Sequence, residues 1–166
     1  MPSPDDLRVL RREIDADLAA VGQLTKELTE ARADLPPEPA QKDVAYLAYL
    51  LHSIYTGWES AMRRIAVVFE NRLDPARWHA QLLQRMILDL PGIRPPVIDP
   101  GLHLHLEKLR SFRHFFRHSY GVPLRWAEIK LVLEASDAVT PAMETCFSRF
   151  LSDVESIADS AEETRS

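Results

Sequence analysis

Cysteine and glycine are scarce in this chain, and long apolar runs are missing from it. The single cysteine, Cys146, cannot form an intramolecular disulfide, and we interpret it as a small core residue. Only five glycines occur among 166 residues. No stretch approaches the roughly 18 uninterrupted apolar residues that a membrane-spanning helix needs. Residues 1–6 carry no basic segment followed by an apolar one, so we expect no signal peptide and a cytoplasmic protein.

Positive charge is also in deficit, because 20 lysines and arginines face 25 aspartates and glutamates, for a net charge of −5. General nucleic-acid-binding domains are usually basic, so any anionic ligand must be met by a local patch. Hydrophobic residues make up 46% and charged residues 27%, a balance that is typical of globular proteins and excludes wholesale disorder. We predict one domain over residues 1–166, with a frayed polar tail at 159–166.

Apolar residues recur at spacings of three, four and seven along most of the chain, which is the period of an amphipathic helix. Strand-like alternation is missing. The pattern therefore predicts an all-α, antiparallel bundle of five to six helices. The expected helices cover 5–33, 40–72, 75–88, 100–119 and the region from 124 onward, where Thr140-Pro141 marks a kink or a new start.

The expected fourth helix concentrates the chain's positive charge. Between Gly101 and Trp126 the only anion is Glu107. The same segment holds five cations, for a local net charge of +4: Lys108, Arg110, Arg113, Arg117 and Arg125. At about 100° per residue, the arginines of this helix and its histidines His103, His114 and His118 share one side. Leu106 is the one apolar residue on that side. We predict a helix with a cationic face and an apolar face.

Arginine and histidine together are a minimal set for cleaving RNA without a metal. A guanidinium holds phosphoryl oxygens through paired hydrogen bonds, and an imidazole with an ordinary pKa of about 6.5 moves protons at neutral pH. Arg113 and His118 lie five residues apart, and thus about 140° apart on an ideal helix. They converge only through the reach of the arginine, through the helix ending near His118, or by pairing with a second subunit.

Other interpretations of the same residues remain open. A charged stripe is most often a solvated helix face. His114 and His118, at i and i+4, are spaced to bind a metal, but neighbouring arginines oppose a cation, and we predict no metal site. Either histidine can be the functional one. Glu59, on the expected second helix, orients a cation such as Arg113 if the two helices pack, and is otherwise a surface glutamate.

Arg113, His118 and Tyr120 form the pattern Arg-x4-His-x-Tyr. This pattern resembles the motif of the HEPN superfamily, specifically of HepT-like toxins from HepT/MntA toxin–antitoxin pairs. The chain is similar to that family outside the motif as well, over about residues 44–133. The similar positions are His52, Tyr55, Trp58-Glu59, Arg63-Arg64-Ile65-Ala66, Trp78-His79 and Arg94-Pro95-Pro96.

The resemblance implies a helical bundle that forms a two-fold dimer and cuts RNA without a metal or cofactor, in a cleft between the subunits. By this resemblance Arg113 stabilises the phosphate and His118 is the general base or acid. Tyr120 stands where a cognate nucleotidyltransferase antitoxin of the MntA type attaches AMP; the alternative is a tyrosine packed at a helix end. The residues implied to support catalysis or bind RNA are Arg110, His114, Arg117 and Glu59.

HEPN domains also include members that do not cut RNA and serve only as partners. The alternative function is therefore a non-catalytic binding module that docks a nucleotidyltransferase or a nucleotide through the same basic face. A purely structural scaffold is a third hypothesis. It predicts that reversing the charges of Arg113 and Arg117 changes neither binding nor toxicity.

Overall fold

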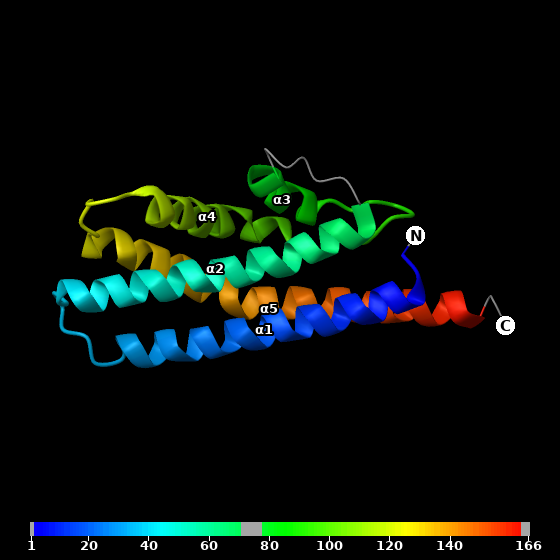
Figure 1. The fold of residues 1–166 in the computed structure, drawn as a ribbon, viewed down its shortest axis with the longest axis horizontal. Coiled ribbons are helices and arrows are strands. Elements are labelled where there is room, and N and C mark those ends of the chain that lie inside the picture. The colour runs from blue at the N-terminus through cyan, green and yellow to red at the C-terminus, as the bar shows by residue number, and fades with distance from the viewer. Residues whose placement is uncertain (1, 71–77, 164–166) are drawn as a thin grey trace.

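The computed structural model describes residues 2–70 and 78–163, which form five α-helices and one short 3₁₀ helix and contain no β-strand. The elements are α1 (Pro4–Arg32), α2 (Gln41–Glu70), α3 (Trp78–Ile87), η1 (Pro100–Leu102), α4 (His103–His118) and α5 (Trp126–Glu163). Figure 1 shows α1, α2 and α5 running lengthwise through an elongated antiparallel bundle, with α3 and α4 along the α2 side. The predicted all-α bundle is confirmed. No helix in the described ranges is both long and apolar enough to cross a membrane.

Helix α2 is the centre of the bundle, because it packs against α1, α4 and α5. Its contact with α1 is close at Gly57, where an added Cβ atom would lie 2.3 Å from Cγ2 of Val21. Its contact with α5 includes the fully buried Trp58, whose ring stacks on Phe147 at 5.8 Å between centroids. Only glycine at position 57 permits the close approach of α1 and α2. The contact with α5 buries two large aromatic rings. Helix α4 packs against a further face of α2.

Helix α5 passes through Pro141 without interruption, so of the kink or new start predicted at Thr140-Pro141 the new start is wrong. Proline removes one backbone donor and usually ends or kinks a helix. Here Val139 and Met143, which flank the proline, are both fully buried. Packing on the two sides of the proline holds the helix together across the missing hydrogen bond.

The helix ends agree with the sequence prediction except at a few positions. Helix α5 continues past Ala158, which is buried, to Glu163, and the fraying expected at 159–166 stays a prediction. Residues 164–166 lie outside the described part of the chain. Residue 75, where the sequence predicts the start of the third helix, also lies outside it. The fourth helix begins at Pro100 as predicted, but its first turn is the 3₁₀ helix η1.

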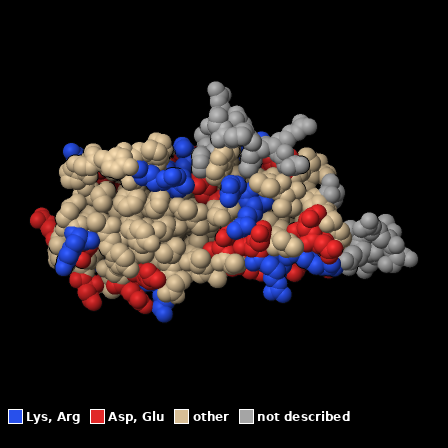
Figure 2. Space-filling view, viewed as in Figure 1, with Lys and Arg blue, Asp and Glu red and all other residues tan. Residues whose placement is uncertain are grey.

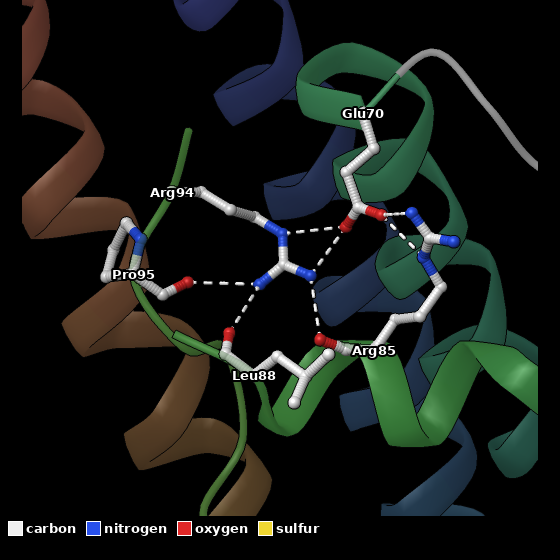
Figure 3. A network of polar contacts seen from close by, with 5 residues as sticks. All are labelled: Glu70, Arg85, Leu88, Arg94 and Pro95. Carbon is white, nitrogen blue, oxygen red and sulfur yellow. Dashed lines mark hydrogen bonds and ion pairs between the residues drawn. The ribbon is translucent and has the colours of Figure 1, made fainter. Parts of the chain in front are cut away.

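The side chain of Arg94 is fully buried and ties three segments together (Figure 3). Its Nε and Nη2 atoms donate to Oε1 of Glu70, at the end of α2, at 3.0 and 2.6 Å. The same guanidinium donates to the backbone oxygens of Leu88 at 3.3 Å, Pro95 at 3.1 Å and Arg85 at 2.8 Å. The second oxygen of Glu70 accepts from the Arg85 side chain. We call this network the Arg94 clamp.

The Arg94 clamp lies just before the segment that leads into α4. The backbone N–H groups of Val97 and Ile98 both donate to the oxygen of Met86, at 2.8 and 3.2 Å, and both side chains are fully buried. The clamp and these two core residues therefore set where η1 and α4 begin. The position of α4 along the bundle, and with it the cationic segment, depends on this loop.

Candidate functional site

Five of the residues predicted to form the site line one concavity on α4, with a volume of about 350 Å³: Arg110, Arg113, His114, Arg117 and His118. We call it the α4 groove. The structure thus gathers the three arginines and two histidines that helical periodicity placed together. Figure 2 shows basic side chains over α4, above a broad surface in the region of α2 that carries few charges.

Arg113 and His118 line the same groove within one chain, although they are five residues apart on the helix. Helix α4 ends at His118, since Ser119 leaves the helical conformation with φ −98° and ψ 89°. Two of the three routes to convergence considered from the sequence, the reach of the arginine and the end of the helix, are therefore sufficient. A second subunit is not needed to bring these two side chains to one surface.

The two histidines of the groove are in contact. Their rings stack at 4.4 Å between centroids, and Nδ1 of His118 lies 2.8 Å from the backbone oxygen of His114. A carbonyl oxygen only accepts hydrogen bonds, so Nδ1 of His118 carries the proton. In the neutral ring the lone pair is then on Nε2. This atom is the one with which His118 can take up a proton.

Arg113 is the most enclosed arginine of the groove, with 12% of its side chain exposed. Its Nε–H donates to Oγ1 of Thr56 at 3.1 Å, and its Nη2 atom lies 3.1 Å from Oε2 of Glu59. Glu59 is buried, so the alternative of a surface glutamate is wrong, and the contact expected if the helices pack is present. A buried charge pair of this kind needs hydrogen bonds as well as opposite charge, and Thr56 supplies one.

The predicted division of α4 into a cationic and an apolar face needs a correction. Leu106, which seemed an intruder on the cationic face, is fully buried, as is Leu109. The side of α4 that faces the bundle follows spacings of four and three through Leu102, Leu106, Leu109, Arg113 and Phe116. Arg113 therefore occupies a core-facing position and the other groove residues flank it.

Arg110 also has a carboxylate partner. Its Nε and Nη2 atoms donate to Oε2 of Glu107, one turn earlier on α4, at 3.0 and 2.8 Å, and this contact raises the pKa of Arg110. Clustered positive charges repel one another unless anions lie between them. Glu107 and Glu59 are those anions, one for Arg110 and one for Arg113.

Helix α2 contributes residues to which sequence analysis assigned no role. His52 is half-buried and its ring lies against Phe116 at 5.1 Å between centroids. Burial, followed by the charges of Arg113 and Arg117, lowers its pKa from the usual value. Tyr55 is buried, and burial together with the neighbouring charge of Glu59 raises its pKa. Both residues belong to the α2 face that meets α4, so their polar character is the signal that sequence analysis overlooked.

Tyr120 is 94% exposed, so the alternative of a tyrosine packed at the helix end is wrong. It is the second residue after the end of α4 and precedes Gly121, whose φ of 69° is a conformation that favours glycine. The tyrosine is not one of the residues that line the α4 groove. It is two residues from His118 in the chain, and its ring is in solvent.

A larger concavity, of about 490 Å³, lies where the end of α1 meets the start of α5. Three of the four charged side chains that line it have partners. Arg32 donates to both carboxylate oxygens of Asp137, at 2.9 and 2.8 Å, and Lys130 lies over the ring of Trp126 at 5.8 Å. We therefore place the candidate site at the α4 groove. Within residues 2–70 and 78–163 no group of three or more histidine, cysteine, aspartate or glutamate side chains is arranged to hold a metal ion.

Comparison with known proteins returned one family. A family model described as HepT-like protein matches residues 46–154, which run from α2 to α5 and include every residue of the α4 groove. No curated protein and no solved structure matches the chain.

Proposed function

The chain belongs to the HepT-like protein family of the HEPN superfamily, and from this membership we propose that it is a toxin that acts as a metal-independent endoribonuclease. The observation that carries the proposal is the α4 groove, in which Arg113 and His118 of the Arg-x4-His-x-Tyr motif line one surface with three further cationic or titratable side chains. A groove of this composition suits a phosphodiester.

In the proposed reaction Nε2 of His118 takes the proton from a ribose 2′-hydroxyl. The 2′-oxygen then attacks the adjacent phosphorus, the bond to the 5′-oxygen breaks, and a 2′,3′-cyclic phosphate forms. The departing 5′-oxygen receives a proton, for which His114 is the neighbouring imidazole. Arg113 stabilises the charge that develops on the phosphoryl oxygens. The hydrogen bond from Nδ1 of His118 to the backbone supports this role, because it leaves Nε2 free.

We further propose a two-fold dimer in which two α4 grooves form one cleft, and a nucleotidyltransferase of the MntA type as the antitoxin. Its target is Tyr120. The 94% exposure of this side chain supports the proposal, because an enzyme must reach the hydroxyl to attach AMP. Tyr120 is two residues from His118 in the chain, so the negative charge and the volume of an attached AMP would compete with RNA for the groove.

The test is cleavage of a short RNA by the purified protein in the presence of a chelator. His118→Ala should lower the rate by about 10²–10⁴-fold, the usual contribution of a general base. His105→Ala is the matched control, because His105 is an exposed histidine of the same helix that does not line the groove, and it should leave the rate unchanged. Equal rates for wild type and His118→Ala would overturn the catalytic assignment.

The same preparation separates the two functions considered from the sequence. Stable binding of a nucleotidyltransferase without RNA cleavage would favour the non-catalytic binding module. Mass spectrometry after co-expression with that enzyme should show one AMP on wild type and none on Tyr120→Phe. Modification of both proteins would place the acceptor elsewhere.

A further inference from the structure

The α2 face that meets α4 is unusually polar for a helix–helix contact. It follows spacings of four and three through Ala48, His52, Tyr55, Glu59, Met62 and Ala66, and all of these except the half-buried His52 are buried. Positions at this spacing normally hold apolar residues that pack against the facing helix. Here Glu59 lies opposite Arg113, the one charged residue in the corresponding row of α4. Each of the two facing rows therefore contains one charged residue, Glu59 on α2 and Arg113 on α4.

Thr56 stands next to this row and is oriented by its own helix. Its hydroxyl donates to the backbone oxygen of His52 at 2.8 Å, so the hydroxyl proton is already engaged. The lone pairs of Oγ1 remain, and one of them accepts from Nε of Arg113 at 3.1 Å. The threonine therefore cannot turn its proton toward the arginine, and it presents an acceptor at a fixed place.

The two α2 residues hold one edge of the Arg113 guanidinium. Thr56 contacts Nε and Glu59 contacts Nη2, and these two nitrogens lie on the same edge of the planar group. The Nη1 side is consequently turned away from both partners. A guanidinium has five N–H donors, so several remain for a phosphate after these two contacts are made.

The other two arginines of the groove are held differently. Arg110 pairs with Glu107 of its own helix, one turn away, and that carboxylate is 28% exposed. Arg117 is exposed. Within the described residues, Arg113 is the one groove arginine whose guanidinium has hydrogen-bond or ion-pair partners on a second helix, and both of those partners come from α2. Its guanidinium is oriented by the bundle, and not by one flexible side chain alone.

We propose that Thr56 and Glu59 are positioning residues that hold the guanidinium of Arg113 in the orientation that stabilises the cleaved phosphate. The role in catalysis rests on the proposed ribonuclease function; the role in fixing Arg113 does not. A long side chain that is ordered before the substrate arrives does not lose its freedom during the reaction, and the benefit appears in the transition state. Loss of the positioning contact should therefore lower kcat and leave KM nearly unchanged.

The experiment compares Thr56→Val with Thr56→Ser in the full-length protein. Valine keeps the shape of threonine and removes the acceptor, whereas serine keeps the hydroxyl. Thr56→Val should lower kcat for a short RNA about tenfold, the size of one lost hydrogen bond, with KM within about twofold of wild type. Thr56→Ser should retain most of the activity. Wild-type kcat in Thr56→Val, or an equal loss in Thr56→Ser, would overturn the catalytic part of the inference.

A second readout does not depend on cleavage. In ¹⁵N NMR spectra the Nε–Hε signal of Arg113 should exchange slowly with water in wild type, and faster in Thr56→Val and in Glu59→Gln. Glu107→Gln is the matched control, since it removes the carboxylate of the other arginine pair in the groove, and should leave the Arg113 signal unchanged.

The two readouts separate the possible failures. If wild type does not cleave RNA, the proposed function fails, and the NMR comparison still decides whether α2 holds Arg113. If the Arg113 signal is the same in wild type, Thr56→Val and Glu59→Gln, the positioning inference fails whatever the ribonuclease activity is.

Discussion

Replacement of Arg94 by methionine should reduce the free energy of unfolding by about 3–5 kcal/mol, the cost of breaking a buried ion pair by removing one partner. The buried guanidinium makes two contacts with Glu70 and three with backbone oxygens (Figure 3). Methionine fills similar space but donates no hydrogen bond. The Glu70 carboxylate, 3% exposed, would keep Arg85 as its remaining clamp partner. For a protein of this size the loss corresponds to a melting temperature roughly 6–20 °C lower.

The matched control is Arg32→Met at the pair with Asp137. This pair also has two short hydrogen bonds, at 2.9 and 2.8 Å, but its side chains are 34% and 54% exposed. Exposed ion pairs contribute at most about 1 kcal/mol because water and salt screen them. The two variants thus remove the same chemical group from a paired carboxylate, in a buried and in an exposed setting.

Urea unfolding followed by circular dichroism measures both changes. A double-mutant cycle of Arg94→Met with Glu70→Gln should show a coupling of about 0.5–3 kcal/mol, because the second substitution removes the charge that the first leaves buried. The reasoning is refuted if Arg94→Met costs no more than Arg32→Met, or if the two clamp substitutions are additive.

Two further predictions concern the helix contacts of α2. Because the pKa of His52 is lowered in the folded chain, by burial first and by Arg113 next, the unfolded state binds more protons as the pH falls below about 6.5, and stability should fall with it. His52→Gln should weaken this decline between pH 7 and pH 5 in urea unfolding; an unchanged slope would contradict it. Gly57→Ala should cost about 1–3 kcal/mol by overpacking against Val21, and Val21→Ala should relieve that cost. Gly22→Ala, with nothing within 4 Å of the added carbon, should instead stabilise the protein by up to about 1 kcal/mol, and equal effects of the two glycine substitutions would count against the argument.

The gathering of Arg110, His114 and His118 could be predicted because it depends on one helix. The spacing of residues along α4 decides which side chains share a side, and that spacing is written in the sequence. The same local rules failed at Pro141, where the buried Val139 and Met143 override the tendency of proline to end a helix. Propensity is a weak guide where packing on both sides is strong.

The contacts of Arg113 could be predicted only in part, because its partners lie on another helix. Thr56 is 57 residues away in the chain, and no periodicity within α4 points to it. A signal was nevertheless present. Arg113 and Glu59 each interrupt a row of otherwise core-facing positions, and a charge in an apolar row requires a partner of opposite charge. Helical spacing could identify both as unusual, but only the packing of α2 against α4 shows that they meet.

The pairing of Arg110 with Glu107 and of Arg113 with Glu59 also limits the electric field of the groove. Three guanidinium groups offset by two carboxylates leave about one net positive charge while the histidines are neutral. Such a site attracts polyanions weakly beyond a Debye length of about 8 Å. For an RNA substrate, capture would follow close contact, and the logarithm of affinity would fall with that of salt at a slope of about −0.7 for each phosphate neutralised. Because the groove carries so little net charge and the chain is acidic overall, we expect weak nonspecific binding to nucleic acid even where nucleic acid is abundant.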